Sequence, residues 1–211
     1  MPDKENSIIA QLRGFDAEHY AATERYARQI ERLYNTACDE FARIGAGMEE
    51  TEAAFSFDKL PKTKKQAQGI LTRLVGKMEA VITTGTKAEW LAACKKNDAF
   101  IAAILRTAKL TKEEVEQYQS RNLEALSTFQ RRKVEGLGLS ERVWKYAGEL
   151  KDAMELGIDV ALGEGKSAQE LSRDLRSYLQ EPHRLYRRVR DKGGNLRLSK
   201  AAKLYHPGQG V

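Results

Sequence analysis

Apolar residues recur at steps of three and four along most of the chain, and this spacing predicts a series of amphipathic helices. The longest apolar stripe runs over residues 8–44, where apolar residues recur mostly at steps of three and four. Gly45 and Gly47 follow it directly, and glycines at such a position are a typical helix stop signal. The pattern therefore predicts one long first helix, which has more apolar length than a compact bundle covers and so favours self-association.

The helical period breaks over residues 48–62. Here Phe55 and Phe57 alternate with polar residues, and Pro61 closes the stretch. Because the stretch is short and aromatic, we expect an ordered crossover with one aromatic side chain anchored in the core. A second amphipathic helix is expected to follow over about residues 64–84.

Three Ser/Thr-x-x-Glu sequences predict helix starts, at Thr86, Thr111 and Ser167. In such a capping box the hydroxyl and the carboxylate each accept a hydrogen bond from an amide that has no partner within the helix. The second of these helices is expected to extend to Phe129. A further helix, with a plausible N-cap at its first residue, is expected over residues 140–162.

These elements predict an all-α fold, an irregular bundle of about six helices with a loosely structured basic C-terminal segment. The small number of prolines agrees with this class. We expect three regions: a long-helix N-terminal region (1–138), a helical module with a Gly turn (139–181) and a basic, weakly structured C-terminal segment (182–211).

Positive charge is concentrated in that C-terminal segment. The chain has a formal net charge of +6. The window from Arg184 to Lys203 holds eight basic residues and one acid, Asp191, so its net charge is +7 and the remaining residues sum to −1. We predict that the basic residues of this window contact a partner or nucleic acid: Arg184, Arg187, Arg188, Arg190, Lys192, Arg197, Lys200 and Lys203.

Three interpretations of the basic window stay open. Its arginines and lysines can neutralise phosphates of nucleic acid, or its guanidinium groups can pair with carboxylates on an acidic protein surface. The third interpretation is a solvated tail that its charge keeps soluble. No recognition helix, zinc finger or RNA-recognition signature accompanies the basic residues, so we do not expect sequence-specific reading of bases.

The chain shows no pattern typical of catalysis, a cofactor or a metal, and we predict a non-enzymatic protein. Residues 163–167 match a phosphate-binding loop only in part, because Val160 stands where that loop needs a glycine. We therefore expect a helix-ending turn before an N-cap serine. His19, His183 and His206 are far apart and lack the spacing of metal ligands.

The remaining candidate residues predict structural roles. Trp90 and Trp144 fall on the inward faces of their expected helices, which predicts core packing. Cys38 and Cys94 lie in helical patterns, and we expect buried thiols rather than a disulfide. No apolar run approaches the roughly 18–20 residues that a membrane span requires, so we expect no membrane span. No signal peptide is recognisable, and we expect none.

One stretch carries a family resemblance. From Trp144, a helix with apolar positions leads to a Gly-x-Ser turn that ends at Ser167, and a short helix with Leu171 and Leu175 follows. This arrangement resembles the phage Mu F-like minor head proteins, the head morphogenesis proteins of tailed phages and prophages. The upstream layout of long amphipathic helices is also similar. Members of that family usually continue into a further C-terminal region, so this chain is expected to correspond to an N-terminal portion.

The resemblance implies a structural protein of a tailed-phage or prophage head that associates with the portal or another head protein. It implies a place in the host cytoplasm during assembly and then in the head of the virion, with DNA as a possible further contact. The residues alone support an alternative, a helical protein that binds nucleic acid without sequence specificity through the basic segment. A third possibility is the helical N-terminal domain of an enzyme whose active part lies beyond residue 211.

Overall fold

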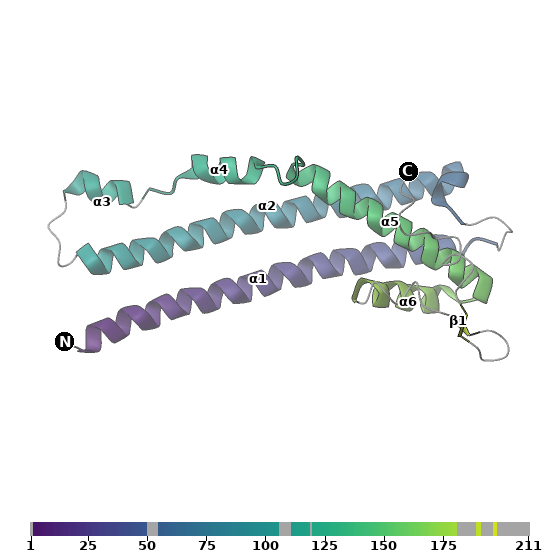
Figure 1. The fold of residues 1–211 in the computed structure, drawn as a ribbon, viewed down its shortest axis with the longest axis horizontal. Coiled ribbons are helices and arrows are strands. Elements are labelled where there is room, and N and C mark those ends of the chain that lie inside the picture. The colour runs from purple at the N-terminus through teal and green to yellow at the C-terminus, as the bar shows by residue number, and fades with distance from the viewer. Residues whose placement is uncertain are drawn as a thin grey trace. The chain divides into compact units, whose positions relative to one another are not determined.

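The computed structural model describes residues 2–49, 55–105, 111–118, 120–180, 189–190 and 196–197. Figure 1 shows their elements in chain order. The α-helices are α1 (Pro2–Gly45), α2 (Pro61–Leu105), α3 (Lys112–Tyr118), α4 (Leu123–Arg131), α5 (Leu139–Glu164) and α6 (Ala168–Gln180). The predicted all-α fold class and the number of helices are confirmed for this part of the chain.

The short elements complete the description. A 3-10 helix, η1 (Phe57–Lys59), lies in the crossover between α1 and α2. Within the C-terminal segment, β1 (Val189–Arg190) pairs antiparallel with β2 (Leu196–Arg197). These two short strands are the part of that segment that the structure describes.

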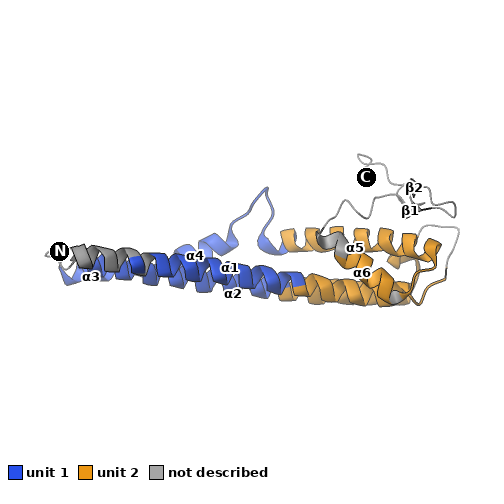
Figure 2. Ribbon diagram, turned by 90° about the horizontal axis from the view of Figure 1, so that it is seen from below, with its two compact units in different colours: residues 1–31, 78–141 blue, residues 32–77, 142–211 orange. Residues whose placement is uncertain are grey.

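The chain forms two compact units, coloured separately in Figure 2. Unit 1 comprises residues 1–31 and 78–141, and unit 2 comprises residues 32–77 and 142–211. Each of the two long helices contributes to both units, so that unit 2 joins two segments that are far apart in sequence. The three regions expected from sequence stay a prediction about domains.

The core of unit 2 contains the largest fully buried side chains of the described residues: Cys38, Phe41, Phe57, Met154, Ile158 and Leu175. The rings of Phe41 and Phe57 lie 5.0 Å apart between centroids, and Phe55 packs edge-on against Phe57 at the same distance. Phe57 is completely buried, whereas Phe55 is half-buried. The predicted anchoring of the crossover by one aromatic side chain is confirmed.

The helix start predicted at Thr86 is wrong. Here α2 continues without a break, and the Thr86 hydroxyl donates to the carbonyl of Ile82 at 2.7 Å, as Thr side chains inside helices do. Glu89, the acid of the expected capping box, contacts His19 of α1 instead. A capping box begins a helix only where the amides that it would satisfy have no helical partner.

The helix predicted from Thr111 to Phe129 is interrupted. Its start is correct, because the Glu114 amide donates to the Thr111 hydroxyl at 3.3 Å and Glu114 accepts from the Thr111 amide at 2.8 Å. Asn122, however, adopts a left-handed backbone with φ of 41° and caps α4 by accepting from the Ala125 amide at 3.1 Å. Asn tolerates this conformation better than most residues, which allows a second helix to start here.

The turn between α5 and α6 is the predicted helix-ending turn. Gly165 has a φ of 66°, and the amide of the next residue, Lys166, donates to the Ala161 carbonyl at 3.0 Å. This is the hydrogen bond of a Schellman motif, which closes a helix through a left-handed glycine. Ser167 then caps α6, with Glu170 accepting from its amide at 2.9 Å.

Gly45, the last residue of α1, provides a test of the packing in unit 2. A Cβ atom at this position would lie 2.8 Å from two carbons of the Ile158 side chain, which is itself fully buried. We expect Gly45→Ala to lower the free energy of unfolding by about 1–3 kcal/mol, because a branched, enclosed side chain must move. Urea unfolding followed by circular dichroism measures the change.

The matched control is Gly76→Ala in α2, where a Cβ atom would meet nothing within 4 Å. There the higher helix propensity of Ala should raise the stability by up to about 1 kcal/mol. Equal effects at the two positions would contradict the close approach of Gly45 to Ile158.

Candidate functional site

The basic residues predicted to contact a partner fall mostly outside the described residues. Arg190 and Arg197 lie in the paired strands, where Arg190 is opposite Leu196 and Arg197 is opposite Val189. The six others lie outside the part of the chain that the structure describes: Arg184, Arg187, Arg188, Lys192, Lys200 and Lys203. Their role stays a prediction.

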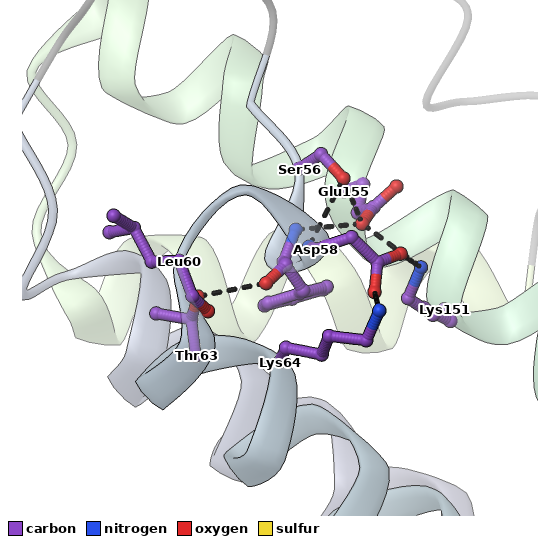
Figure 3. Close-up of polar contacts among 8 residues, drawn as sticks. Ser56, Asp58, Leu60, Thr63, Lys64, Lys151 and Glu155 are labelled. Carbon is purple, nitrogen blue, oxygen red and sulfur yellow. Dashed lines mark hydrogen bonds and ion pairs between the residues drawn. The ribbon is translucent and has the colours of Figure 1, made fainter.

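Two carboxylates of α5 hold the crossover in unit 2, as Figure 3 shows for Glu155. Glu155 Oε1 accepts from the Phe57 amide at 2.8 Å and from the Ser56 hydroxyl at 2.9 Å. Asp159 Oδ1 accepts from the Phe55 amide at 2.8 Å. Amides of an irregular segment need acceptors when water is excluded, and these carboxylates provide them.

Charge pairs surround this latch, which we define as Glu155 and Asp159 with the amides that they accept from. Lys151 Nζ lies 2.7 Å from Asp58 and 3.2 Å from Glu155, and Lys64 approaches Asp58 from α2 at 3.4 Å. The hydrogen bond from Lys151 holds the pKa of the Asp58 carboxyl below its ordinary value. The polar atoms of the latch are thus engaged with one another, which suits a structural role.

A second polar group lies between α1 and α6. The Ser172 hydroxyl donates to Asp39 Oδ1, and Arg176 contacts the same oxygen through Nε at 2.9 Å and through a second nitrogen. Burial alone would raise the pKa of Asp39, but the hydrogen bonds from Ser172 and Arg176 outweigh it, and the pKa lies below its ordinary value. The carboxylate therefore keeps its charge at neutral pH.

This group forms the wall of an open cleft of about 560 Å³, which we call the arginine cleft. It is lined by Asp39, Arg43, Gln169, Ser172, Arg173 and Arg176. Arg43 and Arg173 are exposed, and among the described residues neither has an acid within ion-pair distance. The cleft thus combines three guanidinium groups with one carboxylate. Because positive groups are in excess, its chemistry suits the binding of an anion.

Unit 1 carries an aromatic groove of about 440 Å³. Tyr26 of α1, Trp90 of α2 and Phe129 of α4 contribute aromatic rings to it. The rings of Trp90 and Phe129 lie 6.4 Å apart, and the indole Nε1 of Trp90 donates to the Arg121 carbonyl at 2.9 Å. Trp90 therefore holds the segment before α4 against α2.

The predicted core position of Trp144 is wrong. Its side chain is 38% exposed, and Tyr146 is 53% exposed, while the neighbours Val143 and Ala147 occupy the buried stripe of α5. The helical spacing was correct, but the two aromatic residues flank the stripe rather than lie in it. Exposed aromatic side chains of this size are candidates for a protein interface.

The two cysteine thiols differ in burial. Cys38 is fully buried, and burial raises its pKa to about 12, while Cys94 is half-buried. Both cysteines are free, and the predicted burial is confirmed for Cys38 but not for Cys94. In the described ranges, no three His, Cys, Asp or Glu side chains gather as metal ligands. Of the helices in that part, none has the length and apolar content that crossing a membrane would take.

Comparison of the chain with family models, with curated proteins and with solved structures finds no match. The resemblance to the minor head proteins therefore rests on the sequence alone, chiefly on residues 144–175, and stays a prediction. Within the fold, this stretch forms most of α5, the Schellman turn and the first part of α6.

Sequence reasoning missed both the latch and the arginine cleft. For the cleft a signal was present, since Gln169, Ser172, Arg173 and Arg176 recur at steps of three, one and three and share one face of a helix. For the latch there was none, because Glu155 and Phe57 are 98 residues apart in sequence. Only the fold brings such residues together.

The latch gives a testable consequence. In a Glu155→Ala variant, the buried Phe57 amide and the Ser56 hydroxyl lose their acceptor, and we expect unfolding free energy to fall by about 1–3 kcal/mol. Urea denaturation measures this, and amide hydrogen exchange at Phe57 should accelerate. As a control, Asp152→Asn removes an acid on the same helix whose pKa is raised by burial and by Glu155, so it should leave stability unchanged or higher. If the two variants behave alike, the latch is not a structural element.

A dependence on pH follows from Asp39. Because its pKa is lower in the folded protein than in the unfolded chain, its ionised form contributes stability above the ordinary carboxyl pKa, roughly 4. This contribution is lost as the pH falls through the lower folded value. We expect an Asp39→Asn variant to be less stable than the wild type at pH 6 and to lose less stability on acidification below about pH 4. Urea titrations at a series of pH values measure both slopes, and parallel slopes would contradict the role of Asp39.

Proposed function

We propose that this chain is a non-enzymatic structural protein of a tailed-phage or prophage head, a minor head protein that associates with the portal or another procapsid protein. It acts in the host cytoplasm during assembly and afterwards as part of the head. The resemblance of residues 144–175 supports this proposal, and those residues form a continuous helix–turn–helix stretch in unit 2.

The observation that carries the proposal is the exposure of Trp144 and Tyr146, which lie on the two sides of the buried stripe of α5, so that the partner has to cover the outer face between them. Aromatic residues dominate the binding energy of protein interfaces when a partner covers them. Trp144 belongs to the stretch that carries the family resemblance, and the hydrophobic stripe of α5 does not need it, because Val143, Ala147 and Leu150 already fill the core.

The latch supports an interface on this helix. Glu155 and Asp159 fix the crossover to α5, and Lys151 adds ion pairs to Asp58 and Glu155. Such cross-links hold α5 in one position before a partner arrives, which lowers the conformational cost of binding. Glu155 and Asp159 are both engaged with backbone amides, which suits a structural role for these two carboxylates.

A second candidate function is binding of nucleic acid without sequence specificity through the basic segment 182–211. The observation that favours it is the net charge of +7 between Arg184 and Lys203 in a chain whose other residues sum to −1. Contacts from such a segment to phosphates give affinity without base readout.

The assembly role is tested by co-migration of the full chain with the portal ring encoded beside it, in size-exclusion chromatography. We expect the wild type to co-migrate and the Trp144→Ala/Tyr146→Ala variant to lose affinity by about 100-fold, as loss of two aromatic anchors of about 1–2 kcal/mol each implies.

The matched control is Tyr20→Ala/Phe100→Ala, which removes two exposed aromatic side chains from unit 1. This variant should co-migrate like the wild type. Circular dichroism and thermal unfolding establish that both variants are folded. A wild-type chain that fails to co-migrate with the portal or with other head proteins would refute the assembly role, and equal losses in both variants would refute the interface on α5.

A further inference from the structure

We propose that the arginine cleft between α1 and α6 binds backbone phosphates of nucleic acid, as a contact site separate from the basic segment 182–211. This inference rests on the second candidate function and assigns part of the binding to the folded body of unit 2. The charge count of the sequence does not indicate such a site, because residues outside the basic window are close to neutral in total.

The cleft presents guanidinium groups in prepared positions. Arg176 is fixed by Asp39, which contacts its Nε and a second nitrogen, and Ser172 fixes the carboxylate in turn. A guanidinium has five N–H donors, so this contact leaves others for a ligand. An arginine held by a carboxylate meets a phosphate with less loss of side-chain entropy than a freely rotating one.

The other two arginines provide the net charge. Arg43 follows Asp39 by one helical turn, and Arg173 lies next to Ser172 on α6. Within the described residues, no carboxylate lies at ion-pair distance from either of them. Because Asp39 stays ionised, the cleft has three positive groups against one negative group, and Gln169 adds a neutral amide donor at its edge.

Positive charge continues from the cleft toward α2. Arg43 also lines a second cleft, together with Lys65 and Arg73 of α2, where Arg73 is paired with Glu40 at 2.5 Å. Arg173, Arg43 and Lys65 thus form a track of cations over two neighbouring clefts.

This track favours nucleic acid over an acidic protein surface. Phosphates repeat regularly along a nucleic-acid strand, so one strand can meet Lys65, Arg43 and Arg173 in succession. A carboxylate cluster on a protein would use one part of the track and leave the rest solvated. The cleft is open and polar, which suits a segment of a polymer that passes through it rather than an enclosed small ligand.

The test measures binding of the full chain to a fluorescein-labelled duplex DNA of about 30 base pairs by fluorescence anisotropy, over a series of salt concentrations. We expect the Arg43→Gln/Arg173→Gln variant to bind at least about 10-fold more weakly at 100 mM salt. The slope of log K against log salt should fall in magnitude by about 1.8, the value for two lost phosphate contacts.

The matched control is Arg13→Gln/Arg25→Gln, which removes the same charge from exposed positions on α1 in unit 1. It should bind almost as tightly as the wild type, with an unchanged salt slope. Thermal unfolding establishes that the variants remain folded. Equal losses in the two double variants would overturn the proposal, because net charge alone would then explain the binding.

A third variant separates this proposal from the function on which it rests. It replaces four arginines of the basic segment by glutamine: Arg184, Arg187, Arg188 and Arg190. If this variant loses affinity and the cleft variant does not, the second candidate function stands and the cleft proposal is wrong. If the wild type itself does not bind DNA, both are wrong. If the cleft variant keeps DNA binding but no longer co-migrates with a head protein, the cleft serves an acidic protein surface and the proposal is overturned.

Discussion

The fold of unit 2 depends on how the crossover between α1 and α2 is held against α5. Phe57 supplies the apolar part by packing on Phe41 in the core, and Glu155 supplies the polar part by accepting from the Phe57 amide. Burial of the Phe57 ring also removes the Phe57 amide from water. The ring can therefore be buried only where a hydrogen-bond acceptor for that amide is present. The cleft between α1 and α6 is formed on the framework that this arrangement fixes.

Local chemistry in the sequence identified most elements of the fold. The stripe of α1, the glycine at its end, the capping boxes at Thr111 and Ser167 and the turn at Gly165 all depend on neighbours within a few residues. Each can be recognised because the partners of the hydrogen bonds are close in sequence. The helix start predicted at Thr86 is wrong because the same Thr-x-x-Glu sequence occurs here inside a helix that packing keeps continuous.

The candidate sites were less accessible to such reasoning. Trp144 was assigned to the core because a large apolar residue at helical spacing usually belongs there, yet smaller side chains fill the buried stripe. In the arginine cleft, Asp39 and Arg176 are 137 residues apart, and only the fold shows that Arg176 is paired with this acid, whereas Arg43 and Arg173 have no acid at ion-pair distance among the described residues. Charge summed along a sequence does not show where opposite charges cancel in space.

The composition of unit 2 from residues 32–77 and 142–211 has a consequence for biosynthesis. The ribosome makes α1 and the crossover before α5, so the Phe57 amide lacks its acceptor Glu155 until the chain has grown by 98 more residues. The chain must close a loop of about a hundred residues before these contacts can form. This requirement slows folding and prolongs the exposure of apolar surface. The apolar side chains that α5 and α6 cover in unit 2 therefore stay exposed on the nascent chain until those helices have been made.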